Sequence, residues 1–179
     1  MRFPPLPHLG IQATEVDFGH ARKLDMYQYV SGDSWTYEPD VLSILLCLLG
    51  QHGGGRFINV GANIGYFPIL VKKLFGDSVD VHAYEPMPEL LERLATAQRR
   101  NGIEFRVSGA ALSDFRGSAP FHLSARSDTS NSLNPNFRPA KDVIEVSVTT
   151  LDAEFPEARR RHPLRRNGSS DDGSTVLLI

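Results

Sequence analysis

The sequence has only one cysteine and no long apolar run, and both shortages exclude something. A lone Cys47 rules out a disulfide within the chain, and its position in an apolar segment predicts a buried small side chain, not a nucleophile. That segment, residues 41–49, is far too short to cross a bilayer, and the N-terminus lacks a signal-peptide pattern. These features predict a cytoplasmic protein without a membrane span.

Neither sign of charge is in large excess, with 19 Lys and Arg against 21 Asp and Glu residues. The formal net charge is −2 over 179 residues, so nothing draws the whole chain toward nucleic acid or an anionic membrane. The six histidines are scattered singly, and His, Cys and acidic residues do not show the spacing of metal ligands. We therefore expect no nucleic-acid partner and no metal. No general base and no oligomeric state can be assigned, and the length fits a single domain.

The most informative pattern is a short apolar run that breaks into a glycine turn. Residues 57–60 are followed by Gly61-Ala62-Asn63-Ile64-Gly65, and apolar residues then recur at helical spacing to Phe75. This order predicts a strand over 56–60, a tight turn, and a helix over 66–75. Glycines at such a turn let a ligand approach the main chain without meeting a Cβ atom.

A second apolar run, residues 79–84, ends in Glu85, twenty residues past Gly65. A carboxylate at the tip of the second strand is where the paired hydroxyls of a nucleotide ribose are held. The two strands and the helix between them therefore predict a nucleoside-binding βαβ unit. Glycine turns between a strand and a helix also occur in folds that bind nothing, and a purely structural turn is the alternative.

The type of nucleoside follows from the details of the turn. A dinucleotide fingerprint requires three glycines, but Asn63 and Tyr66 stand where the second and third would be. Tyr66 would crowd the start of the helix, and the turn holds no Lys or Arg to meet a phosphate. The pattern favours a ligand without phosphates whose amino-acid part lies over the turn, which describes S-adenosylmethionine (SAM).

Six segments in a fixed order carry a wider resemblance. They are Tyr37-Glu38-Pro39, Phe57–Tyr66, Tyr84–Pro88, Ala110–Asp114 with Gly117, Asn131–Leu133 and Val148–Asp152. From about Trp35 to Leu151 the chain thereby resembles the FkbM family of SAM-dependent methyltransferases. One position departs from the family pattern, because Asn59 stands where the family usually has Asp. Asn keeps the hydrogen-bonding shape but loses the negative charge that would face the cationic end of the cofactor.

The resemblance implies a Rossmann-like class I methyltransferase, an α/β fold with a parallel sheet and helices on both faces. It implies transfer of a methyl group from SAM to a hydroxyl of a small molecule, such as a sugar or a secondary metabolite. The residues that it assigns to cofactor binding are Glu38, Asn59, Gly61, Ala62, Asn63, Gly65, Glu85, Ser113 and Asp114.

The same resemblance assigns roles within that set. The turn 61–65 would hold the methionine end, Glu85 the ribose hydroxyls, and Ser113 and Asp114 the adenine, while Glu38 would reach the amino group of the cofactor. Asn131 and Ser132 would line the acceptor pocket. Simpler alternatives stay open: a turn residue at Asp114, a helix-start acid at Glu38, and a polar turn at Asn131 and Ser132.

The remaining organisation is read from periodicity and turn residues. Residues 1–34 form an N-terminal extension with a hairpin around 18–30, and residues 35–179 form the SAM-binding domain. Helices are expected over 39–51 and 88–100, a third strand near 104–107, and an added β-pair at 121–123 and 143–148.

The apolar residues 175–179 predict a fourth core strand beside the first, in the order 3-2-1-4. Members of the family continue beyond this strand, so we expect the domain to be partial, incomplete at its C-terminus.

Three functions remain open at this stage. The first is a SAM-dependent O-methyltransferase with a small-molecule hydroxyl acceptor, such as a saccharide. The second is an inactive fragment that binds SAM or another nucleoside, which Asn59 and the expected truncation favour. The third, an NAD-type oxidoreductase, is disfavoured by Asn63 and Tyr66.

Overall fold

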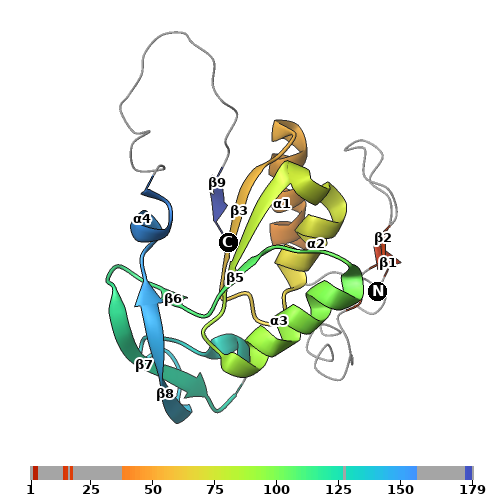
Figure 1. Ribbon diagram of the computed structural model, residues 1–179. Helices are drawn as coiled ribbons and strands as arrows, with labels where there is room; N and C mark the ends of the chain where they lie inside the picture. The colour runs from red at the N-terminus through yellow and green to blue at the C-terminus, as the bar shows by residue number, and fades with distance from the viewer. Residues whose placement is uncertain are drawn as a thin grey trace.

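A four-stranded parallel sheet organises the protein (Figure 1). The computed structural model describes residues 2–3, 14–15, 17, 38–126, 128–156 and 176–178. The strand order is β5-β4-β3-β9, which confirms the predicted order 3-2-1-4. In chain order the strands are β3 (Gly55–Val60), β4 (Val79–Tyr84), β5 (Arg106–Ser108) and β9 (Val176–Leu178).

Helices lie on both faces of this sheet, as predicted (Figure 1). One face is covered by α1 (Pro39–His52), α2 (Tyr66–Phe75) and α3 (Pro88–Asn101). The other face is covered by the short helix α4 (Leu151–Glu154) and by Phe155. Because side chains alternate along a strand, Phe57 packs among the first three helices while Ile58 packs with Phe155. The architecture is α/β and compatible with a Rossmann-like fold.

Helix α1 buries one face and leaves the other exposed. Leu45 and Leu49 are fully buried against the sheet, whereas Ile44 is 61% exposed. Cys47 is exposed, so the prediction that it is buried is wrong. The reason is helical geometry: at about 100° per residue, position 47 lies on the far side of the helix from position 45. The apolar run at 41–49 concealed which side faced the core.

A second, smaller sheet stands beside the first. Its order is β6 (Ala111–Leu112), β8 (Ala140–Thr149) and β7 (Gly117–Ser124). Strands β7 and β8 pair antiparallel over most of their length, which confirms the predicted β-pair and extends it. Its own core contains Phe121, Val146 and Val148, and Met87 packs against that core from the segment after β4. The small sheet is therefore tied to the end of β4.

Several boundaries differ from the predictions. Helix α2 has the predicted bounds, but β5 begins two residues later than expected. Strand β6, helix α4 and the 3-10 helices η3 (Gly76–Ser78) and η4 (Asp128–Ser130) were not predicted. In the N-terminal extension, β1 (Arg2–Phe3) pairs antiparallel with β2 (Thr14–Glu15). The hairpin expected around 18–30 lies outside the described residues. Within the described part of the chain, no helix is long and apolar enough to span a membrane.

The packing of α1 gives a direct test of the fold. Leu45→Ala removes a fully buried side chain, and we expect it to lower the free energy of unfolding by about 2–5 kcal/mol. Ile44→Ala, one residue away and largely exposed, should change it by less than about 0.5 kcal/mol. Denaturant melts of the two variants measure the difference. Equal effects would contradict the orientation of α1.

Candidate functional site

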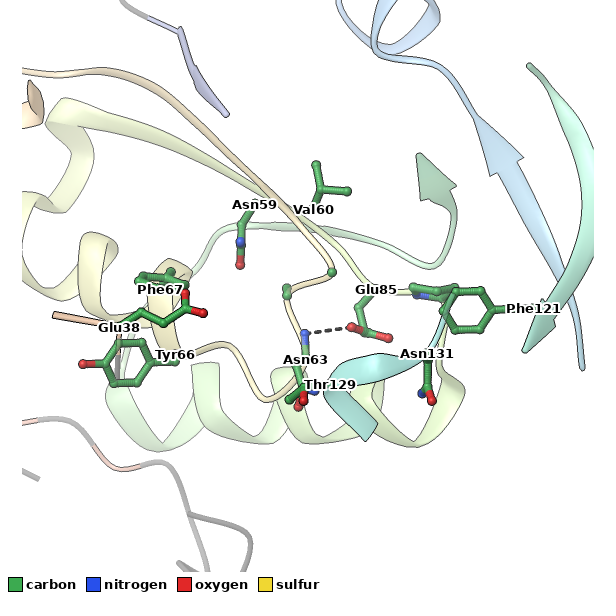
Figure 2. Close-up of a pocket in the computed structure, with 13 residues that line it drawn as sticks. Glu38, Asn59, Val60, Asn63, Tyr66, Phe67, Glu85, Phe121, Thr129 and Asn131 are labelled. Carbon is green, nitrogen blue, oxygen red and sulfur yellow. Dashed lines mark hydrogen bonds between the residues drawn. The ribbon is translucent and has the colours of Figure 1, made fainter. Parts of the chain in front are cut away.

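A pocket of about 230 Å³ opens at the carboxyl ends of β3 and β4 (Figure 2). Strand β3 lies between β4 and β9, so the chain runs outward from it in both directions along the sheet. Ligands of open α/β sheets bind at this kind of switch point. The lining residues are Glu38, Asn59, Val60, Gly61, Ala62, Asn63, Tyr66, Phe67, Glu85, Pro86, Phe121, Thr129 and Asn131.

The glycine turn is held in place by β4. The backbone N–H groups of Gly61 and Ala62 both donate to the carbonyl of Tyr84, at 2.9 Å each. The next N–H, that of Asn63, donates to the Glu85 carboxylate at 2.7 Å, drawn as the dashed line in Figure 2. Three successive turn donors are therefore used within the protein, which leaves none of them for a bound anion.

Glu85 is the buried charge at the centre of the site. Its side chain is 4% exposed, and its second oxygen accepts from the N–H of Met87 at 3.0 Å. Burial raises the pKa of Glu85, and the hydrogen bonds from Met87 and Asn63 oppose that rise. A carboxylate has about four acceptor positions, so two remain after these bonds. Glu85 can therefore accept two further hydrogen bonds.

The two glycines of the turn have different roles. Both have positive φ angles, +76° at Gly61 and +86° at Gly65. A Cβ at Gly61 would meet nothing within 4 Å, whereas a Cβ at Gly65 would lie 2.5 Å from Leu94 and 2.9 Å from Ile69. Gly61 therefore presents open main chain to the pocket, and Gly65 lets α2 pack closely on α3.

Glu38 has an unusual backbone. It precedes α1 with a φ of 47° and a ψ of 64°, in the left-handed region that few residues other than Gly, Asn and Asp adopt. Its carbonyl accepts the N–H of Leu42 at 3.0 Å, which fixes it to the first turn of the helix. Its exposed side chain lines the pocket at the opposite end from Phe121 (Figure 2). Strained residues of this kind gather at binding sites.

The lining is acidic and rich in hydrogen-bond acceptors. Glu38 and Glu85 contribute carboxylates, and none of the described residues that line the pocket is Lys, Arg or His. Asn59, where the family pattern has Asp, is buried at the end of β3 and lines the pocket. Across the described residues, no group of three His, Cys, Asp or Glu side chains is placed to hold a metal ion.

The structure brings most of the predicted site residues together. The pocket includes six of them: Glu38, Asn59, Gly61, Ala62, Asn63 and Glu85. Gly65 lies beneath the turn, and its role in the structure is the packing described above.

Ser113 and Asp114 do not line the pocket. The backbone of Ser113 donates to the carbonyl of Thr149 at 3.0 Å, which holds this segment on the small sheet. The Ser113 hydroxyl donates to the exposed Asp114 carboxylate at 3.2 Å.

Other lining residues were missed or placed only loosely. Asn131, predicted to line a pocket for the methyl acceptor, lines this pocket, while the backbone of Ser132 pairs with that of His122.

Tyr66 and Phe67 directly follow the turn, so their proximity to the pocket could have been predicted from the sequence. That of Phe121 could not, because its place depends on how the small sheet meets β4. The lining residues without a predicted site role are Val60, Tyr66, Phe67, Pro86, Phe121 and Thr129.

The contrast between the two glycines can be measured. Both Gly61→Ala and Gly65→Ala force alanine into a positive φ, but only Gly65→Ala also overpacks the buried Leu94 and Ile69. We expect Gly65→Ala to be less stable than Gly61→Ala by about 1–3 kcal/mol. Thermal melts of the pair provide the measurement, with the backbone strain matched between them. A Gly61→Ala protein as unstable as Gly65→Ala would contradict these roles.

Comparison with known proteins does not identify a function for the chain. No protein-family model matches the chain, and no curated protein matches its sequence. The geometry and charge of the pocket at β3 and β4 are therefore the basis of the functional conclusion.

Proposed function

We propose that this pocket binds SAM and that the protein is a methyltransferase acting on a hydroxyl of a small molecule, such as a saccharide. The observation that carries the proposal is the buried Glu85 carboxylate, hydrogen-bonded to the glycine turn at the carboxyl ends of two parallel strands. The resemblance to the FkbM family supports the same ligand and the same reaction.

The charge of the lining supports a cationic ligand. SAM carries a sulfonium and an ammonium group, and the described lining offers two carboxylates and no cationic side chain. Opposite charges a few ångströms apart in a partly buried site attract strongly, whereas a phosphate would be repelled. The residues present therefore fit SAM in the sign of their charge.

The hydrogen bonds of the turn argue against a dinucleotide. A pyrophosphate is held by free backbone N–H groups at the turn and at the start of the helix. Here the N–H groups of residues 61–63 already donate to Tyr84 and Glu85. The side chain of Tyr66 is buried where the dinucleotide fingerprint has its third glycine. An NAD-type oxidoreductase is the weaker alternative for these reasons.

In this arrangement each residue has a defined task. Glu85 accepts two ribose hydroxyls with the positions left after its bonds to Asn63 and Met87. The open main chain at Gly61 receives the methionine part, and Glu38 faces its ammonium group. When bound, SAM supplies an activated methyl group. The task of the pocket would be to hold an acceptor oxygen close to that methyl group, within about 3–3.5 Å.

A binding module without activity is the second candidate. The described lining contains no histidine, and Glu85 is occupied by the turn and the ribose. A general base for the hydroxyl proton is therefore not assigned among these residues. Binding of SAM without methyl release to any hydroxyl acceptor would favour this candidate.

Titration calorimetry tests the proposal. We expect S-adenosylhomocysteine and SAM to bind with dissociation constants on the order of micromolar, and NAD to bind much more weakly. Glu85→Gln replaces one acceptor oxygen by a donor, so adenosyl affinity should fall by about tenfold or more. Glu89→Gln, on the exposed first turn of α3, is the matched control and should bind normally. A preference for NAD, or undiminished affinity in Glu85→Gln, would refute the proposal.

The raised pKa of Glu85 predicts a pH dependence. Protonation removes the negative charge and one acceptor position, so affinity for S-adenosylhomocysteine should fall as the pH drops through the raised pKa of Glu85. The midpoint should lie above the usual pKa of a glutamate, because burial raises the pKa of Glu85. The free energy of unfolding should depend on pH in the opposite direction to the affinity. Because the pKa of Glu85 is raised in the folded state, its protonated carboxyl stabilises the fold at low pH. That contribution is lost as the pH rises through the raised pKa.

Calorimetry across a series of pH values from neutral to acidic measures this effect, with Glu85→Gln as the variant that cannot titrate. A flat profile in the unchanged protein, or the same fall in Glu85→Gln, would contradict a role for Glu85 in holding the ligand.

A further inference from the structure

The side-chain amide of Asn131 has its oxygen in a hydrogen bond and its nitrogen without an acceptor among the described residues. Its side-chain oxygen accepts from the backbone N–H of Ser124 at 2.9 Å, and Ser124 is buried at the end of β7. Because a backbone N–H can only donate, the atom that faces it must be Oδ1, and the amide orientation is thereby fixed. The Nδ2 group is left as a donor with no acceptor among the described residues, and Asn131 lines the pocket.

The position of Asn131 along the pocket is equally informative. In Figure 2, Glu38 lies at one end, Phe121 and Asn131 lie at the other, and Glu85 lies between Asn63 and Phe121. A ribose on Glu85 has its base on one side and its 5′ substituent on the other. In the proposed binding mode the 5′ substituent lies over the open main chain of the turn, so the base extends toward Phe121 and Asn131.

We propose that Asn131 is a specificity-determining residue that donates a hydrogen bond from Nδ2 to a ring nitrogen of the purine, with the Phe121 ring as an apolar wall. This inference rests on the proposed function and names the part of the chain that reads the base. The small sheet supplies both residues, because Phe121 is on β7 and Asn131 is bonded to the end of β7. The role expected of Ser113 and Asp114 passes to Asn131 and Phe121.

The chemistry of the donor defines what is recognised. The Nδ2 group offers only hydrogens, so its partner must be an acceptor, such as N1, N3 or N7 of adenine. Phe121 is 8% exposed and packs in the core of the small sheet, so its ring is fixed when the ligand arrives. A fixed aromatic wall and a pre-oriented donor select a flat base with an acceptor at one edge.

Single-atom analogues test the hydrogen bond. Calorimetry compares S-adenosylhomocysteine with three analogues in which N1, N3 or N7 is replaced by C–H. We expect at least one analogue to bind the unchanged protein about tenfold more weakly, because the donor then has no acceptor. In Asn131→Asp, which keeps the acceptor for Ser124 but has no donor, that penalty should vanish or reverse.

Asn134→Asp is the matched control. The Asn134 side chain also accepts a backbone N–H, from Asn136 at 2.9 Å, but it is exposed and lies outside the pocket, so the penalty should persist. If the unchanged protein bound all three analogues as tightly as S-adenosylhomocysteine, the inference would be overturned, even if Asn131→Asp were unstable. If the weaker binding of the analogue persisted in Asn131→Asp, the inference would also be overturned, while the proposal that the pocket binds SAM would stand. Failure of the unchanged protein to bind S-adenosylhomocysteine would overturn the proposed function as well.

Discussion

The hydrogen bond between the Glu85 carboxylate and the N–H of Asn63 joins the two strand ends on which the site is built. At 2.7 Å it links the turn after β3 to the residue after β4, and the second bond, to Met87, links the same carboxylate to the segment that enters α3. A buried charge is tolerated only when hydrogen bonds satisfy it. The fold therefore keeps an ionisable group at the floor of the pocket, and the same bonds that make this tolerable also shape the turn.

Because the N–H groups of the turn bind within the protein, the turn cannot hold a ligand in the way that a phosphate-binding turn does. A phosphate-binding turn leaves its N–H groups free for the ligand, but here three of them are spent on Tyr84 and Glu85. The groups that remain for a ligand are hydrogen-bond acceptors. They are the remaining positions on Glu85, the carboxylate of Glu38 and the exposed main chain at Gly61. A ligand with several donors and a positive charge matches that surface. The proposal of SAM over a dinucleotide therefore rests on hydrogen bonds that the glycine pattern alone does not reveal.

The parts of the fold that were predictable are those whose signals are local. Helix α2 has the predicted bounds because Gly65 and Gly76 flank its apolar repeat, and β9 was placed beside β3 because a continuous apolar run indicates a strand covered on both faces. Strand β6 was missed because its pairing with the distant β8 creates it, and α4 was missed because a helix of four residues is too short to show a periodic pattern. The exposure of Cys47 was missed because apolar residues surround α1 on nearly every side, which leaves its buried face undetermined from sequence.

The same distinction explains the candidate site. Glu38, Asn59, Asn63 and Glu85 sit at strand and helix ends that local patterns define, and the structure places them in one pocket. Ser113 and Asp114 were expected near them because the resemblance to the FkbM family implied it. The bond from Ser113 to Thr149 instead attaches that segment to the small sheet, and the partnership of β7 with β8 carries Phe121 to the pocket in its place. The far wall of the site thus depends on contacts between residues distant in sequence. A local motif can therefore locate the turn and Glu85, whereas only the assembled fold shows which residues form the far wall of the pocket.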